Sequence, residues 1–236
     1  MKYEAILFDL DGTLMPTTNE DFEKVYLHSL AETLSEHLEP KFLLTSMWEA
    51  LEIMVLDSSD ATNEAVFYDA FEKRVGEDVF DTIEPMFEAY YLNEFEILKN
   101  VLDDNTKMAQ TVKKLKDKGY RLIIATNPMF PEVAVTQRVL FSGLDPDDFD
   151  FMSNFTLHTQ TKPNLGYYKE VLELNSLNGQ ECLMVGNDME EDMIAKDLGM
   201  DAWLIEDYII NRTDKDLSDW RGTREQFYEK VEEELL

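Results

Sequence analysis

The distribution of apolar and polar residues divides the chain into three stretches. A short apolar run at residues 3–8 predicts a buried strand. From about residue 16 to residue 99, apolar residues recur at i, i+3 and i+4, the spacing of one face of a helix. This stretch contains four such stripes and no convincing strand pattern, so we expect a bundle of about four helices.

After residue 103 the pattern alternates between short apolar runs and helical periodicity. We expect strands at 121–126, 149–152, 182–185 and 202–205. We expect helices at 105–118, 131–141, 164–174, 190–198 and 223–235. Strands that alternate with helices are typical of parallel βαβ units in an open sheet with helices on both faces.

The predicted fold class is therefore α/β. A doubly wound, parallel, Rossmann-like sheet forms the core, and an all-helical domain is inserted after the first strand. We place the core at residues 1–15 and 100–236 and the helical cap at residues 16–99.

Polar residues follow the predicted strands at four places where a strand ends. They are Asp9 and Asp11, Thr126 and Asn127, Lys162 in the loop after the short third strand, and Asn187 with Asp188. Ligands of open parallel sheets bind at the carboxyl ends of the strands, so these residues are the candidate site. Glycine-rich dinucleotide and P-loop fingerprints are absent from the sequence, which argues against NAD and Walker-type nucleotide binding.

The composition narrows the possible partners. The 236 residues include 21 Lys and Arg against 50 Asp and Glu, a formal net charge of −29. Such a field repels nucleic acids and anionic membranes, so we expect neither as a partner, and any phosphate site needs local cations. The single residue Cys182 and three unclustered His exclude a disulfide scaffold and a zinc site of Cys or His ligands. Neither a long apolar run nor a signal-peptide pattern occurs, so we expect a cytoplasmic protein.

The residues at the strand ends resemble the four motifs of the haloacid dehalogenase superfamily, in its phosphatase branch. Phe8 to Leu14 (Phe-Asp-Leu-Asp-Gly-Thr-Leu) resembles the first motif, Thr126 the second and Lys162-Pro163 the third. Gly186-Asn187-Asp188, with Glu191 and Asp192, resembles the fourth. The helical insertion resembles the cap found in phosphoglycolate phosphatase and β-phosphoglucomutase-like members.

The resemblance implies a role for each residue. Asp9 is expected to attack a phosphoryl group and form an aspartyl phosphate, and Asp11 to act as general acid and base. Thr126, Asn127 and Lys162 are expected to bind the phosphate oxygens. Mg²⁺ is the expected cofactor, held by the Asp9 carboxylate, the Asp11 carbonyl and an acid of the fourth motif.

The fourth motif departs from the family pattern. Asn187 stands where the family has an Asp directly after the Gly. An amide oxygen is neutral and cannot replace a carboxylate ligand of Mg²⁺. We therefore expect Asp188 to bind the metal directly, with Asp192 farther out, although Glu191 and Asn187 are alternatives.

The resulting hypothesis is a Mg²⁺-dependent phosphatase for a small phosphorylated metabolite. The presence of Asp11 argues against carbon–halogen hydrolysis, because dehalogenases of the superfamily lack this acid. The cap holds five Lys and Arg against twenty Asp and Glu, which argues against substrates with several extra phosphates. Two alternatives stay open: a sugar phosphomutase of the same branch, and a non-catalytic phosphate- or metal-binding module, which Asn187 favours. The sequence does not fix the oligomeric state, and a monomer is favoured.

Overall fold

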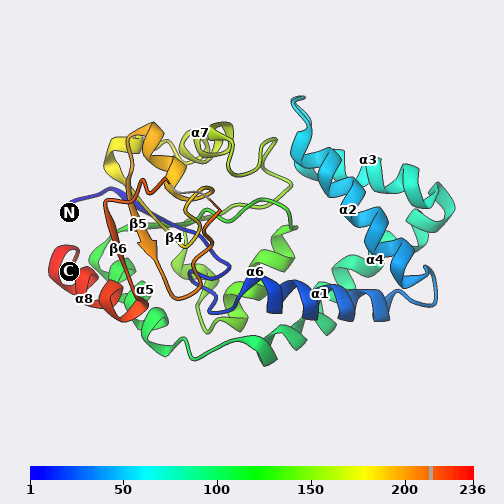
Figure 1. Ribbon diagram of the computed structural model, residues 1–236, viewed down its shortest axis with the longest axis horizontal. Coiled ribbons are helices and arrows are strands. Elements are labelled where there is room, and N and C mark those ends of the chain that lie inside the picture. The colour runs from blue at the N-terminus through cyan, green and yellow to red at the C-terminus, as the bar shows by residue number, and fades with distance from the viewer. Residues whose placement is uncertain (213–214) are drawn as a thin grey trace.

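The computed structural model describes residues 1–212 and 215–236 (Figure 1). In this part of the chain, six parallel strands form one sheet in the order β3-β2-β1-β4-β5-β6. The strands are β1 (Ala5–Phe8), β2 (Arg121–Ile124), β3 (Phe151–Met152), β4 (Cys182–Gly186), β5 (Asp201–Ile205) and β6 (Trp220–Gly222). The chain moves outward from β1 to β3, then returns to the other side of β1 with β4. This places the switch point of the sheet between β1 and β4.

Helices cover both faces of the sheet, as the alternation of side chains along β1 requires. Ile6 and Phe8 belong to the larger apolar cluster, which includes residues of α5 (Thr106–Lys118), α6 (Glu132–Phe141) and α8 (Arg224–Glu234). Ala5 and Leu7 point to the opposite face and pack with α7 (Leu165–Leu174) and η4 (Met193–Leu198). The strands β1, β2, β4 and β5 are almost entirely buried, which explains why they appear in the sequence as continuous apolar runs.

A helical unit lies between β1 and β2 in the chain. It comprises α1 (Asn19–Thr33), α2 (Pro40–Leu56), α3 (Asn63–Val75), α4 (Glu77–Leu92) and the 3₁₀ helix η1 (Glu94–Val101). In Figure 1 this unit extends to one side of the molecule, whereas both chain termini lie at the sheet. Helix α2 packs on α3, and α1 packs on η1.

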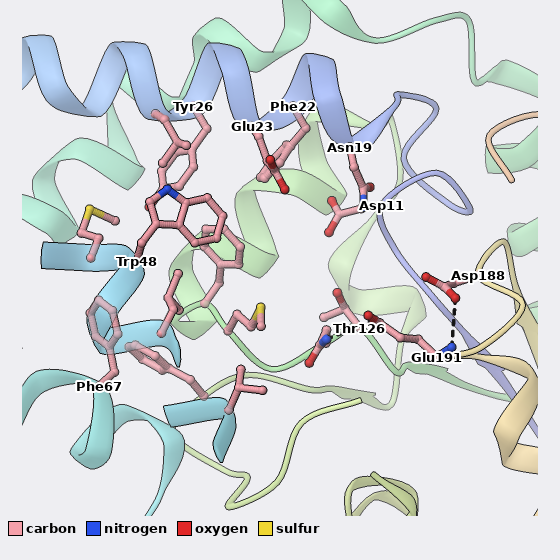
Figure 2. Close-up of a pocket in the computed structure, with 18 of the residues that line it drawn as sticks. Asp11, Asn19, Phe22, Glu23, Tyr26, Trp48, Phe67, Thr126, Asp188 and Glu191 are labelled. Carbon is pink, nitrogen blue, oxygen red and sulfur yellow. Dashed lines mark hydrogen bonds between the residues drawn. The ribbon is translucent and has the colours of Figure 1, made fainter. Parts of the chain in front are cut away.

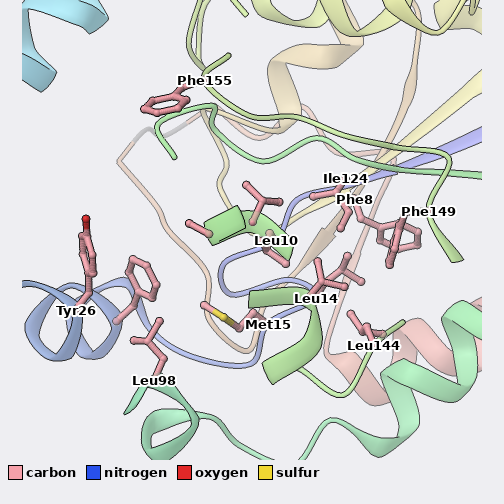
Figure 3. Packing of buried hydrophobic residues seen from close by; sticks show 14 of the residues in the cluster. Phe8, Leu10, Leu14, Met15, Tyr26, Leu98, Ile124, Leu144, Phe149 and Phe155 are labelled. Carbon is pink, nitrogen blue, oxygen red and sulfur yellow. The ribbon is translucent and has the colours of Figure 1, made fainter. Parts of the chain in front are cut away.

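One apolar cluster connects the sheet with the helical unit. Figure 3 shows it extending from Phe8 and Ile124 through Leu10 and Met15 to Tyr26. These side chains are all buried. The turn that follows β1 therefore packs against both the sheet and α1.

The predicted fold class, a doubly wound parallel sheet with an all-helical insertion, is confirmed. The boundaries assigned to the two domains stay a prediction. Strand β6 was not predicted, because three residues are too few for a periodic pattern. The helix expected over 190–198 is wrong in its first turn, since only Met193–Leu198 is helical, and as a 3₁₀ helix. The reason is that the side chains of Asp188 and Asp192 accept the backbone N–H groups that precede it.

Among the helices that the structure describes, none is long and apolar enough to cross a membrane.

Candidate active site

The ends of β1, β2 and β4 bring the first, second and fourth motifs to one edge of the sheet. Phe8 pairs with Ile124 on one side and with Val185 on the other. Asp9 continues β1, and its backbone N–H donates to the Val185 carbonyl at 2.9 Å. The Asp9 carboxylate therefore stands beside the switch point, with Thr126 and Asp188 in the loops of the neighbouring strands.

The turn after Asp9 depends on Gly12. Its φ of +82° lies in the left-handed region, and a Cβ there would overlap the Asn187 amide. That amide is fully engaged, because its oxygen accepts from the Thr13 hydroxyl at 3.0 Å and its nitrogen donates to the Tyr208 carbonyl at 2.7 Å. Asn187 thus ties the β1 turn to the loop after β5.

Two further residues, which the sequence did not indicate as part of the site, donate hydrogen bonds to the carbonyls of the same turn. The buried Arg224 donates to the Thr13 carbonyl at 2.5 Å and to the side chain of Asn105. Asn105 donates in turn to the Leu14 carbonyl at 2.9 Å. Their contacts span more than ninety residues of sequence, so no local pattern indicated them.

Lys162 lies between two buried carboxylates. Its Nζ is 2.9 Å from Asp9 Oδ1 and 2.6 Å from Asp192 Oδ1. Burial raises the pKa of Asp9 to about 6 and that of Asp192 to about 7, against the opposing effect of Lys162. Burial alone would lower the pKa of Lys162, but the two carboxylates hold it well above its usual range. The structure thus brings Asp9, Lys162 and Asp192 together as one buried charged group.

Asp192 also shapes the loop after β4. Its Oδ2 accepts the backbone N–H groups of Asn187 at 3.0 Å and Asp188 at 2.9 Å. A Cβ at residue 186 would overlap this carboxylate, which explains the glycine there. Both carboxylate oxygens of Asp192 are therefore bound by groups of the protein.

Asp188 and Glu191 present their carboxylates beside Arg212. Asp188 Oδ1 accepts the N–H groups of Glu190 and Glu191 at 2.8 and 3.0 Å, and the bond to Glu191 is dashed in Figure 2. Asp188 Oδ2 is 2.8 Å from Arg212 Nη1, which is also 3.4 Å from Glu191. Burial raises the pKa of Glu191.

Asn127 links the loops of the second, third and fourth motifs. Its amide nitrogen donates to Glu191 Oε2 at 3.1 Å. Its oxygen accepts the backbone N–H of Lys162 at 3.2 Å. Asn127 thus fixes the position of Lys162 relative to the loop after β4.

Arg138 is a further charged residue at the site. It is fully buried on α6, and its Nη1 donates to Asp11 Oδ2 at 2.6 Å. The guanidinium lies over the Phe130 ring, 4.4 Å from its centroid. Oδ1 of Asp11 is buried without a hydrogen-bond partner. The sequence held one signal for Arg138, since it falls on the same face of the expected 131–141 helix as Ala134 and Val135.

A cavity of about 560 Å³ opens above these residues, between the sheet edge and the helical unit. Asp9, Asp11, Thr126 and Asp188 are part of its wall. Figure 2 shows Asp11, Thr126 and Asp188 at one end and the aromatic rings of Tyr26, Trp48 and Phe67 at the other. Lys162 is not part of the wall and lies beneath Asp9.

The donor set fits a hard divalent cation. Asp9, Asp188, Glu191 and Asp192 bring four carboxylates to this edge, against the buried Lys162 and the half-exposed Arg212. Mg²⁺ takes one or two carboxylates and completes its shell with carbonyl oxygens and waters. Within residues 1–212 and 215–236, no three His, Cys, Asp or Glu side chains form a metal cage.

Comparisons with known proteins agree with this architecture. The model of the family described as haloacid dehalogenase-like hydrolase matches residues 3–197. Pyrophosphatase PpaX of Bacillus mycoides is 27% identical over 187 residues, 79% of this chain and 76% of that protein.

Two solved structures are similar in fold. The magnesium-bound HAD-hydrolase YfnB of Bacillus subtilis has a TM-score of 0.58 and 18% identity, covering 98% of this chain and 99% of its own. The L-2-haloacid dehalogenase PA0810 also has a TM-score of 0.58, with 16% identity, and the coverage is 97% and 99%. At these identities the likeness establishes the fold and leaves the reaction to the site residues.

Proposed function

The chain belongs to the haloacid dehalogenase-like hydrolase family, and on that premise we propose that it is a Mg²⁺-dependent phosphatase for a small phosphate monoester. One observation carries the proposal. Asp9 lines the cavity, and its carboxylate is paired with Lys162 at 2.9 Å. Asp11, two residues later in the chain, lines the same cavity.

In the first step, a carboxylate oxygen of Asp9 attacks phosphorus and the bond from phosphorus to the ester oxygen breaks. Asp11 transfers a proton to the departing oxygen, which leaves as the alcohol. Arg138 holds Oδ2 of Asp11 and so orients the carboxyl group that carries this proton. The products of this step are an aspartyl phosphate on Asp9 and an ionised Asp11.

In the second step, Asp11 takes a proton from water and the water oxygen bonds to phosphorus. The bond from phosphorus to the Asp9 oxygen breaks, which releases inorganic phosphate and restores the Asp9 carboxylate. The same residue thus serves as acid and then as base, and its proton is restored at the end of the cycle.

The remaining residues of the site bind and orient the phosphoryl group. Thr126, which lines the cavity, would donate its hydroxyl to a phosphate oxygen. Asn127 holds the Lys162 loop, and Lys162 keeps Asp9 ionised and oriented.

Asp9, the Asp11 carbonyl and Asp188 would hold Mg²⁺, which supplies positive charge to the phosphate oxygens in the transition state. Glu191 and Asp192 would lie outside the direct ligands.

Asp11 also supports phosphate chemistry over carbon–halogen hydrolysis. A leaving alkoxide needs a proton, whereas a leaving halide does not. Product analysis with a hexose 1-phosphate separates the phosphatase from a phosphomutase, because the first releases phosphate and the second a phosphate isomer. Release of phosphate that requires Mg²⁺ and Asp9 is the result that the proposal predicts.

Asp188→Asn is expected to raise the Mg²⁺ concentration for half-maximal activity at least about 100-fold, because it removes a direct ligand. Asn keeps an oxygen for the two N–H groups of the loop, so the turn is retained. Glu191→Gln, the matched control, is expected to change this concentration much less than Asp188→Asn does, because Glu191 is not a direct ligand in this assignment. Calorimetric titration with Mg²⁺ provides a second readout, and the reverse order of effects would assign the ligand to Glu191.

Arg138→Met is expected to lower kcat/KM for an alkyl phosphate about 10- to 100-fold, because Asp11 loses its orienting partner. For p-nitrophenyl phosphate the decrease is expected to be less than about threefold, since p-nitrophenolate leaves without a proton. Asp11→Asn should give the same contrast with a larger effect. Equal losses on both esters would mean that Arg138 supports the fold and does not position Asp11.

A further inference from the structure

The cavity extends well beyond the space that a phosphoryl group needs. From Asp9 and Asp11 it continues between α1, α2 and α3, and its volume of about 560 Å³ is that of a site for a drug-sized ligand. The wall of this distal part is mostly apolar. Its aromatic members include Phe22, Tyr26, Trp48, Phe67, Tyr91 and Phe130.

Helix α2 exposes large apolar side chains toward this cavity. Trp48 is 51% exposed, Val55 41% and Leu56 75%, and all three are part of its wall. In Figure 2 the Trp48 ring lies on the side of the cavity away from Asp11. Exposed apolar side chains that converge on one cavity indicate a binding surface, whereas a helix face that only contacts solvent is usually polar.

The distal part of the cavity wall has few polar groups, and its charged side chains there are acidic. The hydroxyls of Tyr26 and Tyr91 lie 3.0 Å apart and bond to each other. Glu23 on α1 and Glu52 on α2 are carboxylates of the wall. An alcohol with few polar groups therefore suits this surface better than a sugar does.

The charges of the wall disfavour a second anionic group on the substrate. Among the described residues that line the cavity, Arg212 is the one Lys or Arg, and it is paired with Asp188 and Glu191. A carboxylate or second phosphate on the alcohol would meet Glu23 and Glu52 without a free cation.

We propose that the substrate is a phosphate monoester of a bulky, largely apolar alcohol with no further anionic group, an inference that rests on the proposed phosphatase activity. The phosphoryl group lies against Asp9 and Thr126, and the apolar part fills the space lined by Trp48, Phe67 and Phe130. Pyrophosphate and phosphorylated small acids lack the apolar part, and they carry a charge that the wall repels.

The test uses alkyl phosphates whose leaving groups have similar reactivity. We expect kcat/KM for 2-(1-naphthyl)ethyl phosphate to exceed that for ethyl phosphate at least about 100-fold, because each buried methylene-sized group contributes roughly a fourfold factor. We expect 2-carboxyethyl phosphate to be no better a substrate than ethyl phosphate. Acetyl phosphate, which is small and reactive, reports Asp9-dependent hydrolysis independently of the apolar part.

A pair of variants on α2 locates the preference. Trp48→Ala is expected to lower the ratio of kcat/KM for the naphthylethyl ester over the ethyl ester at least about tenfold. Ile53→Ala is the matched control, since Ile53 is 53% exposed on the same helix and is not part of the wall. Its ratio should stay within about twofold of the wild type.

The outcomes separate the two claims. Asp9-dependent turnover of acetyl phosphate without preference for the naphthylethyl ester would overturn the substrate class and leave the phosphatase intact. A preference that Trp48→Ala and Ile53→Ala reduce equally would overturn the assignment to this cavity. No Asp9-dependent turnover of any of these esters would overturn the phosphatase, and the substrate class with it.

Discussion

Asp9→Asn is expected to reduce phosphatase turnover at least about 10⁴-fold, to the background of the assay. The amide cannot form an aspartyl phosphate. The other carboxylate that contacts Lys162, that of Asp192, is held on its second oxygen by the backbone N–H groups of Asn187 and Asp188. The change is nearly isosteric, and Lys162 keeps its second partner, Asp192, at 2.6 Å. The fold should therefore persist. The measurement is phosphate release from a phosphate ester with Mg²⁺, together with circular dichroism of the variant.

Asp207→Asn provides a control for this loss. Asp207 lies outside the cavity wall and accepts from the backbone of Arg224 at 2.7 Å. The phosphatase activity of Asp207→Asn should stay within about twofold of the wild type. If Asp9→Asn kept more than about 1% of the wild-type kcat, with deamidation excluded by mass spectrometry, another nucleophile would have to be sought.

Lys162→Met is expected to lower both activity and stability. It leaves the carboxylates of Asp9 and Asp192 buried without their cation, and breaking a buried pair in this way costs about 3–5 kcal/mol. The loss of positive charge beside the nucleophile should reduce kcat at least about 100-fold. Urea unfolding gives the free energy of unfolding, and the phosphatase assay gives kcat.

The double variant Lys162→Met/Asp192→Asn separates the two effects. Removing one unpaired carboxylate should restore part of the stability, while kcat stays low because the cation is still missing. Lys169→Met, at an exposed position on α7, should change neither quantity appreciably. A stability loss below about 1 kcal/mol for Lys162→Met would contradict a buried cation that pairs two ionised acids.

The sheet and its candidate site could be predicted because their signals are local in the sequence. Asp9, Thr126 and Asn187 each follow a buried apolar run, and parallel strands bring their carboxyl ends together. Gly12 indicates the turn, because glycine adopts a left-handed φ without the steric cost that other residues have. Helices of the insertion showed clear i, i+3, i+4 stripes for the same reason.

Contacts between distant segments could not be predicted in this way. The ion pair of Arg138 with Asp11 joins residues 127 positions apart, and the bonds of Asn187 depend on the Tyr208 loop. Whether Trp48 and Phe67 face the cavity depends on how α2 packs against α1 and α3. Periodicity indicates that a face is apolar, but the partner of that face is a property of the tertiary structure.

The most direct test of the central claim is to trap the phosphorylated enzyme. Asp11→Asn should slow hydrolysis of the aspartyl phosphate, so that it accumulates when acetyl phosphate and Mg²⁺ are supplied. After acid quenching, peptide mass spectrometry should find one phosphoryl group on Asp9 and none in Asp9→Asn. A phosphoryl group on another residue, or its absence from every peptide while the wild type turns over, would contradict the proposed mechanism.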